Sequence, residues 1–370
     1  MFRILSSCSL LLLCVLVFAC SFRDPLKIGF IGGVSGRVAD LGVAGRNGVM
    51  LAIEQRNAAG GVGGRQVELL VKDDEQNPEV ARKAMAELLK QRVELVIGPM
   101  TSNISLAILE QVNGSATVLL SPTVTTTELT GKDDNFLRVA GDTRTYAAKA
   151  ARYQVQKLGN RTAAAIYDQS NRAYTESWLA EFKHDYEQHG GKLVKTLPYQ
   201  AGPDTSFQAL SAELLKSRPQ LLLILGNAVD SALICQHLRR LDSRTPILMS
   251  EWASTERFIE LAGAAAEGVL VSQYIDRNNQ SERYQTFRKL YRERFGAQEP
   301  GFAGLAGYDA ALAALETYAA RKPGETIKQA LIRIGRFQGG QQEYTIDRFG
   351  DADRATYTTI VRNGRFLTLE

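Results

Sequence analysis

Short apolar runs alternate with segments of helical period along most of this chain. From residue 26 the apolar runs are LKIGFIGG, QVELLVKDD, ELVIG and TVLLS, and segments of helical period at 43–58, 78–91 and 104–112 separate them. A strand, helix, strand order of this kind is typical of a parallel sheet, because each parallel connection needs a crossover. The pattern predicts an α/β fold with a mainly parallel, helix-covered sheet.

The same alternation begins again near Tyr146. The second set of apolar runs is TAAAIYD, KLVKTLPY, QLLLILG, PILMS and GVLVSQY, with helical segments at 177–189, 207–217 and 230–241. Two sheets of the same kind predict two similar lobes. Because no low-complexity linker separates them, we expect several short crossings between the lobes.

The end of the chain changes character. Helical segments at 282–295 and 304–321 are followed by QEYTID and by TYTTIVRNGRFLTL. In the last run, Asn363 and Gly364 predict a tight turn between two antiparallel strands.

The N-terminus predicts export. Ten apolar residues at 10–19 follow Arg3, a run too short for a bilayer that needs about 20 residues but suited to a signal peptide over residues 1–19. The sequence LVFAC resembles a bacterial lipobox, in which cleavage leaves Cys20 as a lipidated N-terminus; ordinary peptidase cleavage nearby is the alternative. We expect a protein on the periplasmic or cell-surface side, lipid-anchored to a bacterial membrane.

Size and charge narrow the class of protein. Removing 19 residues from 370 leaves 351, enough for two domains. Cys8 and Cys14 leave with the signal peptide, so Cys235 has no partner for a disulfide. The 44 basic and 40 acidic residues are interspersed, which indicates neither a nucleic-acid partner nor an anionic membrane face.

A glycine-rich segment, AAGGVGGRQVELL, invites comparison with a phosphate-binding loop. It lacks the Lys-Ser/Thr of a P-loop, and it follows a helix and precedes a strand, which is the reverse of the order that such a loop needs. We expect a helix end at Gly60 and Gly61 and a tight turn at Gly63 and Gly64.

Metal and catalytic motifs are absent from the sequence. Histidine occurs three times, and no CxxC, HExxH or GxSxG is present, so we expect no metal, no cofactor and no enzyme activity. Ser102 or Ser121 as a nucleophile would require a distant base, which makes a cleft-serine hydrolase the weaker alternative.

Two stretches, ELVIGPMTSNIS and TVLLSPTVTTTELT, run from a strand into clustered hydroxyl groups. Parallel sheets hold ligands beyond the carboxyl ends of their strands. If a helix begins at Ser102 or Asn103, its free N–H groups favour an anion such as a carboxylate. A plain N-cap explains Ser102 equally well, and turn chemistry after the proline explains Thr123, Thr125 and Thr126.

The second lobe offers three corresponding strand ends, YDQSNRAY, LGNAVD and MSEWAST. In the last of these, Glu251 comes directly after a buried strand. A carboxylate at that position is either a helix-cap acid or a ligand for a cation.

Several of these motifs occur together, in an order that resembles a known family. The run from IGFIGGVSGRVADLGVAGRNG to VKDDEQNP, followed by ELVIGPMTSNIS, LLSPTVTTTELT and FLRVAGD, resembles the periplasmic leucine/isoleucine/valine-binding proteins of ABC transporters, from Lys27 to about Phe366. The resemblance implies a two-lobed type I fold, each lobe a doubly wound mainly parallel sheet, with a hinge crossed three times. Lobe 1 is then 25–141 plus 275–347, and lobe 2 is 142–274 plus 348–370.

The resemblance also implies roles for individual residues. Ser102 and Thr125 match the residues that bind the ligand carboxylate. Thr123, through its backbone carbonyl, and Thr125 and Glu251 match those that hold the ammonium group. Tyr174 matches the tyrosine that the closing lobe lays over the ligand.

Three departures from the family pattern leave the recognised side chain open. A cysteine pair common in the family is replaced by residues 75–77 and Thr101. The aromatic residue expected after QLLLILG is missing from 227–229, and Leu41 stands where a larger aromatic residue can line the pocket. Trp252, beside Glu251, is a candidate to compensate.

Together these features predict a non-enzymatic, exported solute receptor that closes on a small molecule and delivers it to the permease of an ABC importer. An amino acid is the expected ligand. The alternative within the same fold is a sensor for amides or for aromatic or aliphatic acids.

Overall fold

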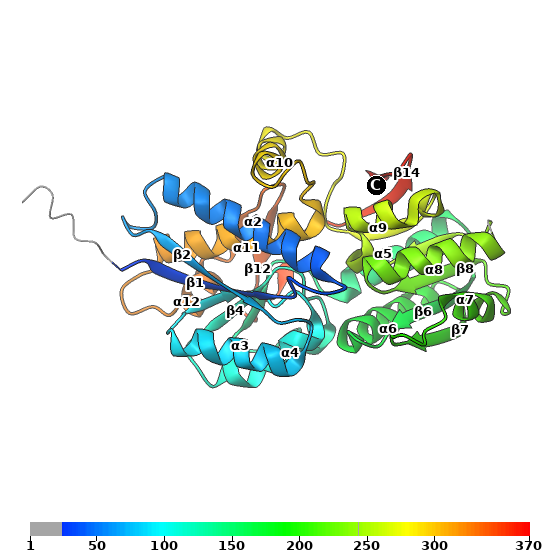
Figure 1. Cartoon of the computed structure of the whole chain (residues 1–370), viewed down its shortest axis with the longest axis horizontal. Helices are drawn as coiled ribbons and strands as arrows, with labels where there is room; N and C mark the ends of the chain where they lie inside the picture. The colour runs from blue at the N-terminus through cyan, green and yellow to red at the C-terminus, as the bar shows by residue number, and fades with distance from the viewer. Residues whose placement is uncertain (1–23, 243) are drawn as a thin grey trace, which may run out of the picture.

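The computed structural model describes residues 24–242 and 244–370, and it folds into two lobes that lie side by side along the longest axis (Figure 1). The sheet of the first lobe is fully parallel, in the order β2-β1-β3-β4-β5. Its strands are β1 (Leu26–Gly32), β2 (Val67–Asp73), β3 (Leu95–Ile97), β4 (Val118–Ser121) and β5 (Phe136–Arg138). The order reverses between β1 and β3, which is where doubly wound sheets bind ligands.

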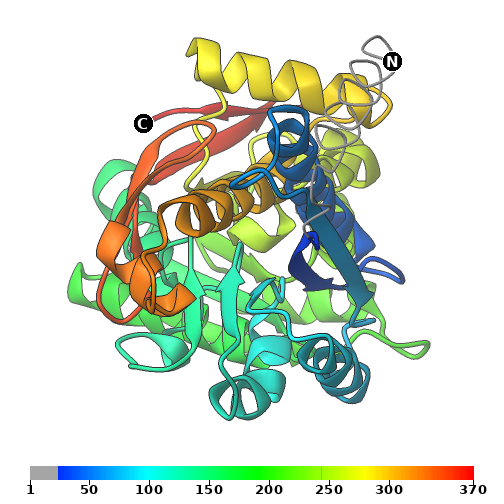
Figure 2. The ribbon, with the colours of Figure 1, turned by 90° about the vertical axis from the view of Figure 1, so that its left-hand side faces the viewer.

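Helices cover both faces of this sheet (Figure 2). Apolar side chains of α3 and α4 share one core with one face of the sheet, and α2 packs with α11 over the other. The helices of this lobe are α2 (Ala39–Ala58), α3 (Pro78–Lys90), α4 (Ser102–Asn113), α10 (Glu282–Arg294), α11 (Gly301–Ala320) and α12 (Ile327–Ile334).

Glycines bring α2 and α11 into close contact. A Cβ added at Gly48 would lie 2.0 Å from the carbonyl oxygen of Gly304, and one at Gly307 would lie 2.1 Å from that of Gly45. Only glycine allows backbones to approach this closely. The two helices are therefore fixed against each other, and their N-terminal ends carry Leu41 and Phe302 to the same side of the lobe.

The second lobe repeats the topology of the first. Its sheet has the order β15-β14-β10-β9-β8-β6-β7, in which β7-β6-β8-β9-β10 is parallel and matches the first sheet strand by strand. Antiparallel β14 and β15 extend it, joined by a turn in which Asn363 and Gly364 have φ values of 51° and 66°, as the sequence predicts. The strands are β6 (Thr162–Asp168), β7 (Lys192–Tyr199), β8 (Leu221–Leu225), β9 (Ile247–Met249), β10 (Leu270–Gln273), β14 (Tyr357–Arg362) and β15 (Arg365–Thr368).

Helices also flank the second sheet. They are α5 (Thr143–Arg152), α6 (Arg172–Gln188), α7 (Phe207–Leu215), α8 (Ala228–Leu241) and α9 (Glu256–Ala262). Shorter turns are η1 (Thr127–Leu129) in the first lobe and η2 (Tyr153–Lys157), η3 (Glu251–Ala253) and η4 (Gly263–Ala266) in the second. The two doubly wound sheets confirm the predicted α/β class.

The chain passes between the two sheets after β5, after β10 and before β14. A small antiparallel sheet, formed by β11 (Arg336–Gln338), β12 (Glu343–Ile346) and β13 (Ala352–Asp353), precedes the last crossing. Arg354 on that crossing is fully buried: it pairs with Asp309 at 2.9 Å, donates to the carbonyl of Val139 on the first crossing, and lies 4.1 Å from the ring centre of Tyr274 on the second. One guanidinium therefore joins all three crossings. The lobe boundaries at 141/142, 274/275 and 347/348 stay predictions.

The glycine-rich segment has the expected structural role. Helix α2 ends at Ala58, and Gly60 and Gly61 follow with positive φ. Gly63 and Gly64 form the turn between Val62 and Arg65.

Several helix boundaries differ from prediction. Helix α2 begins four residues before the predicted 43, and α6 begins five before the predicted 177. None of the predicted helical segments corresponds to α5, α9 or α12. Among the residues that the structure describes, no helix is long and apolar enough to cross a membrane. The predicted signal peptide and Cys20 lie outside the described residues.

Candidate functional site

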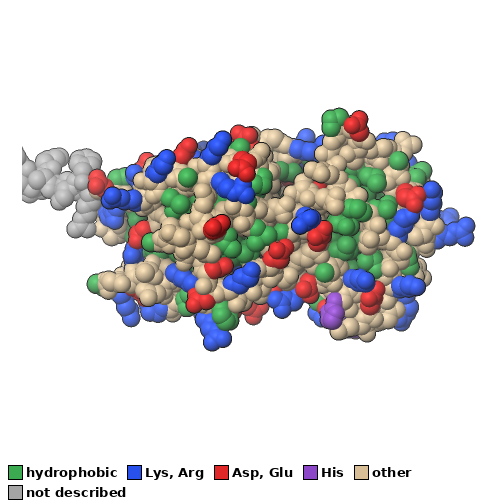
Figure 3. Space-filling view, turned by 90° about the horizontal axis from the view of Figure 1, so that it is seen from below, with side chains coloured by type: hydrophobic (Ala, Val, Ile, Leu, Met, Phe, Trp, Pro, Cys, Tyr) green, Lys and Arg blue, Asp and Glu red, His purple; other side chains and the backbone are tan. Residues whose placement is uncertain are grey.

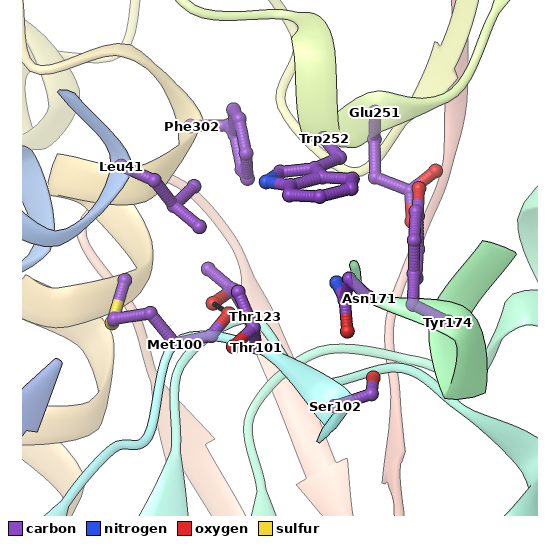
Figure 4. A pocket seen from close by; sticks show the side chains of 10 residues that line it. All are labelled: Leu41, Met100, Thr101, Ser102, Thr123, Asn171, Tyr174, Glu251, Trp252 and Phe302. Atoms are coloured by element: carbon purple, nitrogen blue, oxygen red, sulfur yellow. Dashed lines mark hydrogen bonds between the residues drawn. The ribbon is translucent and has the colours of Figure 1, made fainter. Parts of the chain in front are cut away.

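A pocket lies between the lobes, at the carboxyl ends of both parallel sheets (Figure 4). Six predicted site residues line it: Leu41, Ser102, Thr123, Tyr174, Glu251 and Trp252. The seventh, Thr125, lies behind the pocket wall, where its hydroxyl donates to Glu251 Oε1 at 3.5 Å. The structure therefore brings together all seven predicted ligand-binding residues from distant parts of the chain.

The hydroxyl of Ser102 is available to a ligand. Ser102 is the first residue of α4, and Thr101 holds the N-cap position without a side-chain cap bond, so the N-cap interpretation of Ser102 is wrong. Ser102 is buried by its surroundings, yet its hydroxyl forms no hydrogen bond to the described residues. The side chain instead faces the pocket (Figure 4).

The loop after β4 supplies a second polar wall. The hydroxyl of Thr123 donates to the carbonyl of Met100 at 2.6 Å, while its own carbonyl accepts no hydrogen bond from the described residues. Turn chemistry explains Thr126, whose hydroxyl accepts from the Glu128 N–H at 3.2 Å. The loop thus offers a free carbonyl at Thr123, while the hydroxyl of Thr125 contacts Glu251 from behind the wall.

Glu251 is a buried carboxylate from the second lobe. It begins the short turn after β9, with 5% of its surface exposed. Its Oε2 accepts from the indole N–H of Trp178 at 3.0 Å. No Lys, Arg or His in the described chain forms an ion pair with it. A buried carboxylate without a cationic partner is costly.

Burial raises the pKa of Glu251 to about 7, although hydrogen bonds from neighbouring groups, including Trp178 and Thr125, partly offset the effect. The pKa of Tyr174 is raised well above its usual value, first by burial and then by the nearby Glu251 charge. Near pH 7 the carboxyl group of Glu251 therefore exchanges between neutral and ionised forms, and a cation in the pocket would favour the ionised form.

The remaining walls are apolar. The ring of Tyr174 meets Trp252 edge-on, with ring centres 5.7 Å apart at 83°. Leu41, Met100 and Phe302 stand on the side of the pocket opposite Tyr174 (Figure 4). The pocket therefore has one polar end and one apolar end.

Four further residues line the pocket that the sequence does not predict as site residues: Met100, Thr101, Asn171 and Phe302. Three of them lie within segments that were singled out for their position after a strand. Phe302 comes from α11, roughly 200 residues after Met100 and Thr101. No local sequence pattern marks it as a pocket residue. Thr101 Oγ1 donates to Gln76 Oε1 at 3.1 Å, so a hydrogen bond joins the two loops at the positions where the resemblance implies a cysteine pair.

The segment LGNAVD does not line the pocket. Its Asp230 is buried at the start of α8 and forms an ion pair with Arg37 of the first lobe. Asp40 of the first lobe likewise accepts from the Thr255 hydroxyl of the second at 2.7 Å. These contacts across the cleft define a closed arrangement of the lobes.

Two similar parallel sheets whose carboxyl ends meet at one pocket between the lobes define a bilobal small-molecule-binding protein. The chain belongs to the periplasmic binding protein family, whose sequence pattern matches residues 25–365. Membership confirms the resemblance noted in the sequence.

Individual relatives agree with this placement. A leucine-, isoleucine-, valine-, threonine- and alanine-binding protein of Pseudomonas aeruginosa is 26% identical over 250 residues, which cover 67% of this chain and 66%, just under two thirds, of the relative. The crystal structure of a leucine-binding protein from Thermotoga maritima has a TM-score of 0.85 at 25% identity and covers 93% of this chain and 98% of its own. A branched-chain amino-acid transporter substrate-binding protein from Streptococcus pneumoniae, solved with isoleucine, shares the fold at a TM-score of 0.85 and 23% identity over 93% of this chain and 99% of its own.

Proposed function

We propose that this protein is an exported receptor that binds an α-amino acid between its closing lobes and delivers it to the permease of an ABC importer. One observation carries the ligand class: the Glu251 carboxylate is buried in the pocket wall without a cationic partner among residues 24–242 and 244–370. An ammonium group is the partner that such a carboxylate favours.

The opposite wall suits the other charge of an amino acid. Ser102 presents a free hydroxyl at the first turn of α4, where the positive end of the helix dipole favours a carboxylate. The carbonyl of Thr123 adds an acceptor for the ammonium group, and the hydroxyl of Thr125 supports Glu251 from behind by donating to its Oε1. In this proposal Tyr174 covers the ligand.

The apolar end of the pocket would receive the ligand side chain. Leu41, Met100, Trp252 and Phe302 offer aliphatic, thioether and aromatic surfaces and no charge. An apolar side chain is therefore preferred to a charged one. The named ligands of the relatives support this class, since each includes leucine or isoleucine.

A second ligand class has one specific observation in its favour. Because the pKa of Glu251 is raised to about 7, a neutral Glu251 can donate a hydrogen bond to an aromatic or aliphatic acid that has no ammonium group. A receptor of that kind would fit a sensor as well as an importer. The neighbouring genes distinguish the two functions: genes for a permease and an ATPase would indicate transport, and a gene for a kinase or a regulator would indicate sensing.

A hydrolase has less support. The hydroxyl of Ser121 donates to the carbonyl of Pro99 at 2.8 Å and accepts from Val124, and the hydroxyl of Ser102 has no base as a partner among the described residues.

On the face shown in Figure 3, acidic and basic side chains are mixed over both lobes, as the interspersed charges of the sequence predict.

We also propose that Cys20 anchors the receptor to a bacterial membrane.

A thermal-shift screen with amino acids, amides and aromatic acids tests the ligand class. A ligand that binds only the folded form raises stability by RT ln(1 + [L]/Kd), about 2.7 kcal/mol at a hundredfold excess over Kd. We expect the largest shifts from amino acids with apolar side chains. If only carboxylic acids without an amino group raise the melting temperature, the cargo is such an acid and not an amino acid.

A further inference from the structure

Two helices from opposite lobes meet with their N-termini facing each other across the cleft (Figure 1). They are α4 of the first lobe and α6 of the second. Neither has a side-chain cap of its own, because Thr101 and Asn171, at the two N-cap positions, make no cap bond to their own helices. Free N–H groups at both helix starts therefore need acceptors from elsewhere.

Each cap comes from the other lobe. The side-chain oxygen of Asn171 accepts from the backbone N–H of Asn103 at 3.1 Å, and the side-chain oxygen of Asn103 accepts from the N–H of Ala173 at 2.8 Å. The side-chain amide of Asn103 also donates to the carbonyl of Ser170 at 2.8 Å. All three hydrogen bonds cross the cleft.

This reciprocal arrangement depends on closure. Two helix N-termini that face each other bring two partial positive charges together, and the asparagine oxygens place negative charge between them. When the lobes separate, both helices lose their caps in the same step. An N-cap of this kind typically contributes a factor of about five to an equilibrium.

We propose that Asn103 and Asn171 form a latch that holds the closed arrangement without ligand. The proposal rests on the closing receptor described above. Ser102 is the neighbour of Asn103 and faces the pocket, so a ligand carboxylate at Ser102 would lie beside the same two N-termini. Ligand and latch would then favour closure together.

Amide hydrogen exchange of the ligand-free chain, resolved by residue with NMR, tests the latch. In Asn103→Ala the N–H of Ala173 loses its acceptor, while the N–H at position 103 keeps Asn171 as a potential partner. If the pair is a latch, the lobes open more often and both amides exchange about fivefold faster or more. The matched control is Asn113→Ala on the same helix, whose side chain accepts from Asn135 within the first lobe at 2.9 Å; it should change neither amide.

Two results would overturn the latch. Faster exchange at Ala173 alone would mean a local cap, and unprotected amides at both sites in the wild type would mean that the pair does not hold the lobes together. The converse variant, Asn171→Ala, keeps the test decisive if Asn103→Ala folds poorly, because it too should speed exchange at both amides. No ligand is needed, so a thermal-shift screen without amino-acid hits would refute the proposed cargo and leave the latch result intact.

Discussion

The indole N–H of Trp178 donates to the Glu251 carboxylate at 3.0 Å, and both residues are almost completely removed from solvent. The two side chains come from α6 and from the turn after β9, so their meeting fixes the carboxylate within the second lobe. Thr125 reaches the other carboxylate oxygen from the first lobe. Glu251 thus depends on hydrogen bonds from both lobes.

Replacing Trp178 should weaken amino-acid binding. Trp178→Phe keeps an aromatic ring against Phe182 but leaves Oε2 of Glu251 without its N–H donor. A hydrogen bond to a charged group contributes about 1.5–3 kcal/mol, so we expect at least a tenfold loss of affinity by calorimetry. Tyr186→Phe is the control, because Tyr186 lies on the same helix as Trp178 and its hydroxyl donates to the carbonyl of Asn160. Equal losses in the two variants would mean that Trp178 acts through packing alone.

Stability should depend on pH through Glu251. Between pH 4.5 and about 7 the unfolded chain ionises this group while the folded chain keeps it protonated, so the free energy of unfolding falls as pH rises through that window, by about 3 kcal/mol at most. Glu251→Gln lacks this contribution. Urea unfolding of the ligand-free proteins should show the variant gaining stability relative to wild type from pH 5 to pH 8. Parallel pH profiles would contradict a raised pKa.

The buried pair at the hinge should be needed for folding. Arg354→Met leaves Asp309 as an unpaired charge in the core, and breaking a buried pair in this way costs about 3–5 kcal/mol. Replacing both partners by apolar residues should cost less than the single change. Arg321→Met is the control, since its pair with Glu94 is partly exposed and contributes about 1 kcal/mol at most. Similar urea midpoints for Arg354→Met and Arg321→Met would refute the claim that the buried Arg354–Asp309 pair is needed for folding.

The membrane anchor has its own test. Cell fractionation should place the wild-type protein with membranes and Cys20→Ala in the soluble fraction, because the variant has no thiol to lipidate. Mass spectrometry of the wild-type N-terminal peptide should show the acyl groups. A wild-type protein that is already soluble and unmodified would refute the lipobox interpretation.

Local patterns in the sequence predict much of this fold. Strands such as β1 and β8 are short apolar runs, and α3 is marked by Asn77 and Pro78 at its start and by an apolar stripe. Helix α5 was missed because most of its residues, TRTYAAKAAR, are polar or alanine, and contacts with α6 provide its stability. Propensity alone does not reveal such packing.

The site residues also divide into those that the sequence predicts and those that only the fold reveals. Ser102 and Glu251 lie in the segments that follow β3 and β9, so strand position was enough to nominate them. Phe302 reaches the pocket only because glycine contacts fix α11 against α2. The exchange of caps between Asn103 and Asn171 was also beyond prediction, because it requires two helix ends 68 residues apart to meet across the cleft.

The central claim is that the pocket recognises both charges of an amino acid. Calorimetry with the best amino acid from the screen and with its deaminated analogue, on wild type and on Glu251→Gln, tests it most directly. We predict that wild type binds the amino acid at least tenfold more tightly than the analogue, and that Glu251→Gln loses that preference while its affinity for the analogue changes little. Equal affinities of the wild type for the two compounds would contradict the account and would make an aromatic or aliphatic acid the ligand.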